Sequence, residues 1–233
     1  MLKYKWSWKM DLLLILAIII VPLIAQIGIK ISYNKHSKIE NGMHMKGEEV
    51  ARKILDMNGL RNVKINMVGG TLSDYYDPRV KSVNLSPEIF AERSISSAAV
   101  AAHECGHAIQ DKENYGFLRL RSKLVPVVNF SSRFATFFIL LGLFINSQTG
   151  LTLFYIGIIL MTLGLLFQLI TLPVEFDASR RARKQLEKCG LIEKKDSKGV
   201  NKVLKAAAYT YVANFLATAL QIVRLVLLNR NRR

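Results

Sequence analysis

Long apolar blocks divide this 233-residue chain and constrain its fold more than any other feature. They lie at about residues 12–29, 134–145, 151–172 and 206–228. A helix of about 20 apolar residues crosses the hydrocarbon core of a bilayer, which is about 30 Å thick. The sequence therefore predicts a mainly α membrane protein with 3–4 transmembrane helices. The fourth span stays open, because Gln221 and Arg224 in the last block also fit a helix lying at the membrane interface.

The first block has an alternative interpretation as a cleaved signal peptide, because three lysines precede it. Two observations oppose this interpretation. The block is longer than the apolar region of a typical signal peptide, and no small-x-small cleavage site occurs before Lys30. We therefore expect an uncleaved transmembrane helix with Trp6 and Trp8 at the interface.

The pentapeptide His103-Glu104-Cys105-Gly106-His107 carries the chemistry that the sequence predicts. It follows the pattern H-E-x-x-H, and residues i and i+4 of an α-helix lie on one face. His103 and His107 can therefore bind one Zn2+ ion, while Glu104 acts as general base on a zinc-activated water. The alternative is a pair of ordinary helical histidines, which fits less well because the chain has only four His. Cys105 is expected to point away from the metal and to be buried.

A catalytic zinc ion usually has three protein ligands, so the motif needs a third. A metzincin would have His at position 113, where this chain has Glu113, and that class is excluded. His36 and His44 lie in a linker near the membrane and are weaker candidates. Glu175 is the better candidate, because a carboxylate just after an apolar span is costly unless it is paired or binds metal.

The surroundings of Glu175 in the sequence support this choice. A new helix can start after Pro173, and Ser179 then lies one turn beyond Glu175 on the same face. The Ser179 hydroxyl is expected to hold the liganding carboxylate. Asp177 projects to another face of this helix. It is the alternative third ligand if the helix is rotated so that Asp177, and not Glu175, faces the histidines.

The sequence does not single out the group that stabilises the oxyanion of peptide hydrolysis. The side chains that qualify by type are Tyr75, Tyr76, Tyr209, Tyr211 and Arg180. A short strand near residues 82–85 is expected to offer an edge on which an extended peptide substrate can pair.

The net charge of +16 suggests nucleic acid as a partner, but no nucleic-acid-binding motif accompanies it. The basic residues lie beside apolar blocks, which favours anionic lipid, above all along residues 180–205. The link 146–150 is uncharged, whereas Lys and Arg flank the two middle blocks. The positive-inside rule therefore places the motif domain in the cytoplasm. A spanning last block would put Arg230 outside, which conflicts with that rule. Two cysteines imply no disulfide framework.

These features predict five consecutive parts. Residues 30–133 form a zincin-like α+β metalloprotease domain that contains the H-E-x-x-H helix and a short β-hairpin or small sheet, with strands near 63–68 and 82–85. The other parts are an N-terminal transmembrane helix (1–29), a transmembrane helical hairpin (134–172), a third-ligand helix with a basic cytoplasmic segment (173–205), and a C-terminal transmembrane or interfacial helix (206–233).

Three functions are compatible with a zinc-binding motif in a membrane protein. The leading hypothesis is a zinc endopeptidase that cleaves proteins or peptides at the membrane surface. A site-2-type intramembrane protease needs the motif inside a span, but the polar run that starts at Gln110 ends the motif helix after about 15 residues, too few to cross a bilayer. A non-catalytic zinc-binding scaffold or regulator usually has a closed four-ligand site rich in Cys, which this chain does not offer.

Several segments besides the motif resemble one known family. They are Asp-Tyr-Tyr-Asp-Pro-Arg at 74–79, Leu-Arg-Leu-Arg-Ser at 118–122 and Leu-Pro-Val-Glu-Phe-Asp-Ala-Ser at 172–179. In order and spacing they resemble the YugP-like bacterial membrane zinc metallopeptidases, over nearly the whole chain. The resemblance implies a neutral zinc metallopeptidase, multi-pass in the bacterial plasma membrane, and implies no particular substrate.

A more distant likeness is to the HtpX-like membrane endopeptidases. Their third zinc ligand is the Glu of an E-F/Y-x-A-D segment that follows a pair of spans. Residues 175–179 of this chain are similar through Ala178, which implies that Glu175 is the ligand here. Ser179 replaces the final Asp of that pattern, so the partner of the ligand is open.

Overall fold

The structure is a computed structural model that describes residues 8–231, without the side chains of Arg230 and Asn231. Trp6, for which an interface position was expected, lies outside the described residues. The chain forms two compact units. The span unit comprises Met1–Ala25, Leu120–Thr171 and Tyr211–Arg233, and the motif unit comprises Gln26–Arg119 and Leu172–Thr210.

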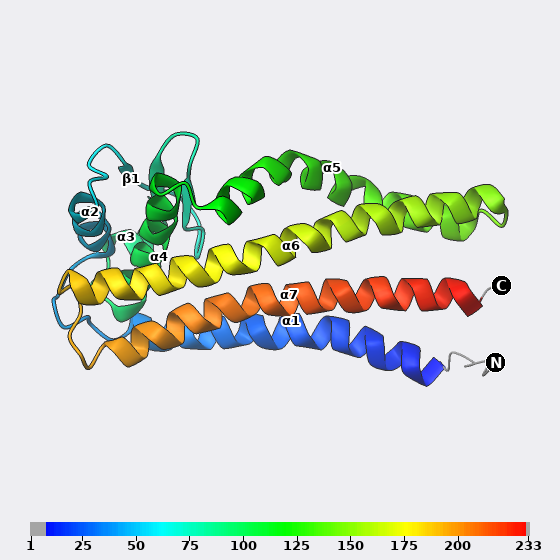
Figure 1. The fold of residues 1–233 in the computed structure, drawn as a ribbon. Coiled ribbons are helices and arrows are strands. Elements are labelled where there is room, and N and C mark those ends of the chain that lie inside the picture. The colour runs from blue at the N-terminus through cyan, green and yellow to red at the C-terminus, as the bar shows by residue number, and fades with distance from the viewer. Residues whose placement is uncertain (1–7, 232–233) are drawn as a thin grey trace. The chain divides into compact units, whose positions relative to one another are not determined.

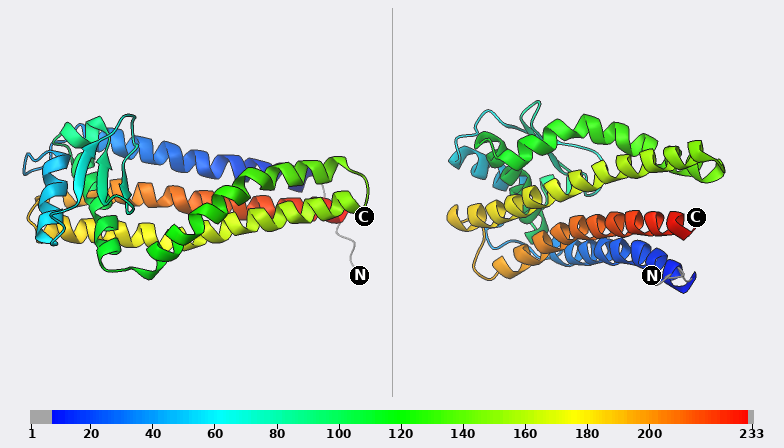
Figure 2. Two further views of the ribbon diagram at one scale, coloured as in Figure 1. Left: turned by 90° about the horizontal axis from the view of Figure 1, so that it is seen from above. Right: turned by 45° about the vertical axis from the view of Figure 1, so that its right-hand side comes forward.

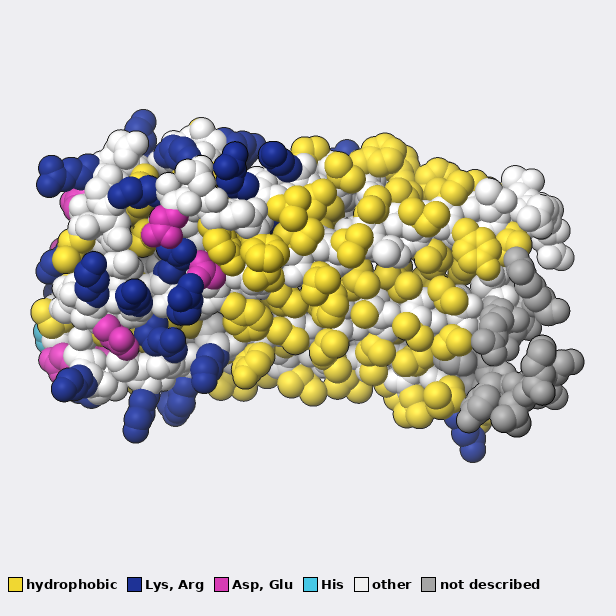
Figure 3. All heavy atoms as spheres, viewed as in Figure 1, with side chains coloured by type: hydrophobic (Ala, Val, Ile, Leu, Met, Phe, Trp, Pro, Cys, Tyr) yellow, Lys and Arg dark blue, Asp and Glu magenta, His cyan; other side chains and the backbone are white. Residues whose placement is uncertain are grey.

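Four long helices supply the apolar segments of the span unit (Figure 1). They are α1 (Trp8–Ser37), α5 (Gly116–Phe144), α6 (Gln148–Lys188) and α7 (Ser197–Asn231). All four are long and apolar enough to cross a membrane. On the face drawn in Figure 3, hydrophobic side chains cover the helices of the span unit, as a surface that contacts lipid requires. The prediction of a mainly α protein with 3–4 transmembrane helices is confirmed, with four candidate spans.

Within the span unit, α5 and α6 form a closely packed hairpin, and Figure 2 shows the two helices side by side. Glycines permit this approach. A Cβ atom on Gly142 would lie 2.5 Å from the backbone nitrogen of Phe154, and one on Gly157 would lie 2.8 Å from the backbone nitrogen of Ile139. Both distances are too short for a side chain, so small residues at these positions let the two backbones come together.

A bidentate ion pair joins α1 and α7 inside the span unit. The Nε and Nη2 atoms of Arg224 donate to the two carboxylate oxygens of Asp11, at 2.7 and 3.1 Å. A charged group in an apolar block is costly unless it is paired, and Asp11 supplies the pairing for Arg224. The sequence left a spanning or an interfacial last helix open, and this pair fits the spanning one. It also places the first turn of α1 and the last turns of α7 at the same end of the span unit.

The motif unit contains three short helices and a small sheet. The helices are α2 (Gly47–Met57), α3 (Pro87–Ala91) and α4 (Ile95–Lys112), and the strands are β1 (Lys64–Met67), β2 (Tyr75–Asp77) and β3 (Ser82–Leu85). The strand order is β1-β3-β2, with β1 parallel and β2 antiparallel to β3. The small sheet was predicted, but β2 was not, because three residues are too few for an alternating pattern to show.

The sheet corrects one expectation about substrate binding. Residues 82–85 form the central strand, which is buried along its whole length and pairs on both sides. They therefore offer no free edge, and the edge strands are β1 and β2. The error arose because a buried strand and an edge strand of this length look alike in sequence.

The core of the motif unit is built around α4. Its alanines 98, 99, 101 and 102 are fully buried, and small side chains allow α2 and α3 to pack close to the helix. The Ser94 hydroxyl caps the helix by accepting a hydrogen bond from the backbone N–H of Ser97 at 3.0 Å. This bond satisfies one of the free backbone N–H groups at the start of α4.

Candidate metal centre

Helix α4 places the two motif histidines on one face. The ring centroids of His103 and His107 lie 4.8 Å apart, with the rings nearly perpendicular. The side chain between them points elsewhere: the Cys105 thiol is fully buried, and its Sγ lies 3.5 Å from the carbonyl oxygen of Ala51 on α2. The helical spacing thus aims both imidazoles at the same point and leaves the thiol in the core.

Helix α6 brings a carboxylate to the same point. The helix passes through Pro173 without ending, so the expected new helix start after Pro173 is wrong. Apolar membrane helices tolerate such prolines, because neighbouring groups satisfy the freed carbonyl. Inside the motif, Gly106 lies against α6: a Cβ on Gly106 would be 2.6 Å from the carbonyl oxygen of Ala178. This close approach delivers Glu175, which is 2% exposed, to the histidine face of α4.

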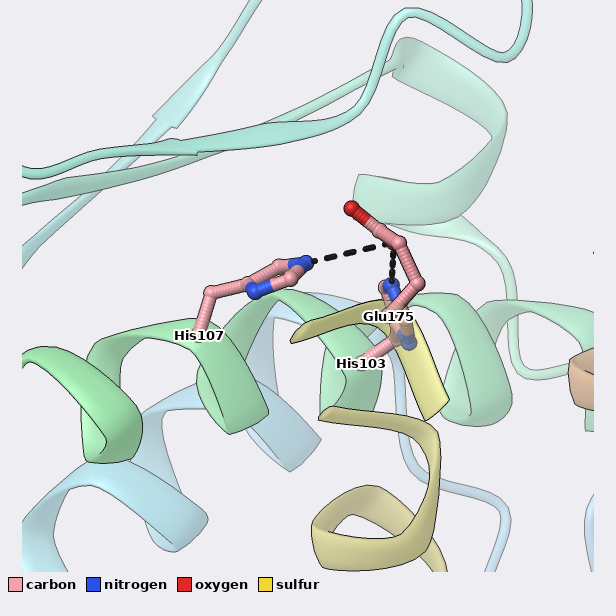
Figure 4. A group of neighbouring side chains, drawn as sticks. All are labelled: His103, His107 and Glu175. Atoms are coloured by element: carbon pink, nitrogen blue, oxygen red, sulfur yellow. Dashed lines mark hydrogen bonds and ion pairs between the residues drawn. The ribbon is translucent and has the colours of Figure 1, made fainter. Parts of the chain in front are cut away.

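The three side chains converge, as Figure 4 shows. One carboxylate oxygen of Glu175 lies 3.3 Å from Nε2 of His103 and 3.6 Å from Nε2 of His107. All three ligand atoms lie within 4.8 Å of one another. Ligand atoms around a tetrahedral zinc ion, with bonds of about 2.0–2.1 Å, are about 3.4 Å apart. Both the two-nitrogen, one-carboxylate donor set and its spacing therefore fit zinc.

The other residues considered as ligands lie elsewhere. His36 is buried, with Nδ1 2.7 Å from the carbonyl oxygen of Ser32, and His44 is exposed and pairs with Glu40. Asp177 is on α6 but faces Gln110 and two arginines. None of the three belongs to the converging group.

Glu104 is buried beside the group, with 7% of its surface exposed. Burial raises the pKa of its carboxyl to about 7; His103 opposes this rise, and the carboxylates of Glu175 and Asp74 add to it. The backbone N–H of Tyr76 on β2 hydrogen-bonds to Glu104 and also lowers the pKa. A carboxyl that changes protonation near neutral pH is suited to accept and return a proton.

Gln110 connects the two ligand-bearing helices. Its amide nitrogen donates to the carbonyl oxygen of Val174 at 2.8 Å and to the carboxylate of Asp177 at 2.9 Å. These two acceptors orient the amide so that its oxygen, 3.0 Å away, accepts from Nδ1 of His107. A protonated Nδ1 leaves Nε2 of His107 unprotonated and directed at Glu175, as a metal ligand requires. Sequence reasoning missed this residue, although Gln110 lies three positions after His107 on the same helical face.

Residues 11–230 match the family described as "putative neutral zinc metallopeptidase". The chain belongs to this family. It is also 47% identical, over 209 residues, to a Bacillus subtilis protein described as "Putative membrane protease YugP", and the match covers 90% of this chain and 92% of that protein. No solved structure matches the chain. The predicted resemblance to YugP-like zinc metallopeptidases is thereby confirmed.

In this family member, Ser179 has a different neighbour from the one expected. Its hydroxyl was predicted to hold Glu175, and in the structure it lies 3.2 Å from Nδ1 of His103. Each motif histidine thus has a polar side chain at its second ring nitrogen, Ser179 for His103 and Gln110 for His107. Such partners fix the ring orientation and raise the basicity of a metal ligand.

Two arginines on α6 pair with the carboxylate that holds Gln110. Asp177, which holds Gln110, pairs with Arg180 and, at 2.5 Å, with Arg181. Arg181 also contacts Glu113 at 2.6 Å. Glu113, at the position where a metzincin has its third histidine, therefore has a structural partner on α6.

Two of the residues considered for stabilising the oxyanion already bind carboxylates of this chain. The Tyr76 hydroxyl donates to Asp111 at 2.6 Å, and burial together with this carboxylate raises its pKa. Arg180 pairs with Asp177. Tyr75 and Tyr209 are exposed, at 48% and 60%.

Proposed function

We propose that this chain is a membrane-anchored zinc endopeptidase that cleaves proteins or peptides at the membrane surface. The convergence of His103, His107 and Glu175 on one point, with the buried Glu104 beside them, carries the proposal. Membership of a zinc metallopeptidase family supports it.

Different residues would bind the metal, transfer the proton and orient the ligands during hydrolysis. His103, His107 and Glu175 would hold zinc, which when bound polarises the scissile carbonyl and acidifies water. Glu104 accepts a proton from the attacking water and returns it to the leaving amine. Its carboxyl is buried beside the three converging side chains, which suits it to this role. Gln110 and Ser179 hold the imidazoles in the orientation that ligation requires.

Strand β2 is the better candidate for holding an extended substrate. It is an edge strand, and the backbone N–H of its Tyr76 hydrogen-bonds to Glu104. A peptide added to this edge would run past the general base, with main-chain hydrogen bonds supplying affinity for many sequences. An extended substrate would therefore pair with residues 75–77 and not, as the sequence suggested, with residues 82–85.

We place the motif unit on the cytoplasmic side of the bacterial plasma membrane. The uncharged link 146–150 and the Lys and Arg on either side of the hairpin support this orientation. With four spans, the start of α1 and the end of α7 face the outside, where Arg230 is an exception to the same rule. A Ser147→Cys variant should react with a membrane-impermeant thiol reagent in intact cells, whereas a Lys194→Cys variant should react only after lysis; the reverse labelling pattern overturns the orientation.

The two other functions are less well supported. An intramembrane protease needs its motif in a span, and α4 is not among the four candidate spans of the described residues. A structural zinc site has no use for a buried carboxyl such as Glu104, whose burial beside the metal group is costly.

Glutamine at position 104 tests the mechanism. Glu104→Gln keeps the shape of the side chain and removes the proton acceptor, so we expect normal zinc content and loss of cleavage of a denatured protein or peptide library by at least about a hundredfold. Glu187→Gln, an exposed carboxyl on α6, is the matched control and should cleave normally. A Glu104→Gln protein as active as the wild type would contradict the proposal.

A further inference from the structure

The motif unit contains a second feature suited to ligand binding. A cavity of about 240 Å³ lies between the segments of α6 and α7 that belong to this unit. Its polar lining includes the cations Arg180, Arg183 and Lys205, and its apolar lining includes Phe176, Leu204 and Tyr209. We propose that this cavity binds the phosphate headgroup of an anionic phospholipid.

The charge of the cavity supports an anionic ligand. Among the described residues, only Arg180 of the three cations pairs with a carboxylate, that of Asp177. Arg183 donates at 2.9 Å to the side-chain oxygen of Asn201, which carries no charge, and Lys205 has no ion pair within the described part of the chain. No acidic residue is among the lining residues. Two uncompensated positive charges therefore face one cavity, and a phosphate group would pair with both.

The apolar lining and the place of the cavity in the chain favour a lipid over a free phosphate. Phe176 comes one turn after the apolar block of α6 ends, and Leu204 comes just before the apolar block of α7 begins. The cavity therefore lies where both helices leave their apolar segments, at the level of phospholipid headgroups. Phe176 and Tyr209 are 46% and 60% exposed, which leaves an apolar surface for the glycerol and the first part of the acyl chains.

The cavity also adjoins the metal centre. Ser179 lines it, and the same hydroxyl lies 3.2 Å from Nδ1 of His103. Arg180 lines it as well and pairs with Asp177, which holds Gln110. A headgroup in the cavity would touch Ser179, which positions His103, and Arg180, whose partner Asp177 holds the residue that positions His107. These contacts are a physical route by which lipid composition influences the site.

Lipid binding to the full-length protein tests the proposal without an activity assay. The protein, purified in a neutral detergent, is titrated with phosphatidylglycerol or phosphatidylcholine, and bound lipid is counted by native mass spectrometry. The double variant Arg183→Gln/Lys205→Gln removes the two unpaired cations. Lys184→Gln/Lys202→Gln removes the same charge from exposed positions on the same two helices that do not line the cavity.

We expect the cavity variant to bind phosphatidylglycerol about tenfold more weakly than the wild type and the control variant. Phosphatidylcholine should bind weakly and equally to all three proteins. Equal zinc content and helicity show that the variants are folded. Equal phosphatidylglycerol affinity in the two double variants overturns the proposal. It is also overturned if inorganic phosphate displaces phosphatidylglycerol at equal concentration.

Discussion

The two units of this protein contain buried or half-buried charge for different purposes. In the span unit, Arg224 and Asp11 satisfy each other through two hydrogen bonds, and the pair joins α1 to α7. In the motif unit, Glu104 is buried with partners that only partly compensate its charge, and its pKa rises to about 7. The difference shows that a fully paired charge, such as Arg224 with Asp11, stabilises the packing of helices. A charge that is only partly compensated, such as Glu104, has a shifted pKa and can take part in chemistry.

The largest effect is expected from removing the carboxylate ligand of the motif unit. Glu175→Ala deletes the only carboxylate of the converging group, so zinc affinity should fall by more than the roughly 10- to 100-fold that the loss of a ligand's partner costs. Metal analysis of the purified protein measures this, with Glu187→Ala on the same helix as control. Unchanged zinc affinity would contradict Glu175 as the third ligand.

The incomplete pairing of Glu104 predicts a cost in stability. Its pKa is about 7 in the folded protein, against an ordinary value of 4.5. Above pH 4.5 the unfolded chain releases this proton while the folded protein retains it, so rising pH favours unfolding, and the full penalty, about 3 kcal/mol, is reached above pH 7. In chelator-treated samples, Glu104→Gln should therefore melt at a higher temperature than the wild type at pH 8, and the difference should vanish near pH 4. A variant that melts at or below the wild-type temperature at pH 8 contradicts this account of the burial.

Gln110 tests whether the network behind the histidines matters for ligation. Gln110→Leu keeps the volume but removes the acceptor for His107 and the link to α6. Zinc affinity should fall about 10- to 100-fold, measured by competition with a chromophoric chelator. Gln110→Glu retains an acceptor for His107 and should recover part of the loss. If the Gln110→Leu and Gln110→Glu variants both bind zinc as tightly as the wild type, Gln110 has no positioning role.

The smallest effect is expected in the span unit. Arg224→Leu leaves Asp11 unpaired and should lower stability by about 1–3 kcal/mol, less than a fully buried pair because both side chains are about one fifth exposed. The double variant Asp11→Leu/Arg224→Leu should recover most of this loss in thermal unfolding. Zinc content should be unchanged in both, and a loss of zinc would mean that the two roles of charge are not separate.

Local patterns in the sequence predicted much of this molecule. Apolar length predicted the spans, and i,i+4 spacing predicted the histidine pair. Glu175, which the structure brings to that pair, was predicted because a carboxylate after an apolar span needs a partner. What sequence reasoning missed depends on tertiary contacts. Strand β2 is too short to show a pattern, and the partners of Gln110 and Ser179 arise only when α6 packs against Gly106.

The most direct test of the central claim joins metal content to cleavage in one sample. Wild-type protein and Glu104→Gln are stripped with chelator, zinc is returned in steps, and bound zinc and peptide cleavage are measured at each step. We predict that wild-type cleavage rises in proportion to bound zinc, while Glu104→Gln binds the same zinc and cleaves at least about a hundredfold more slowly at every step. Cleavage that does not follow bound zinc, or that is equal in the two proteins, would contradict the account.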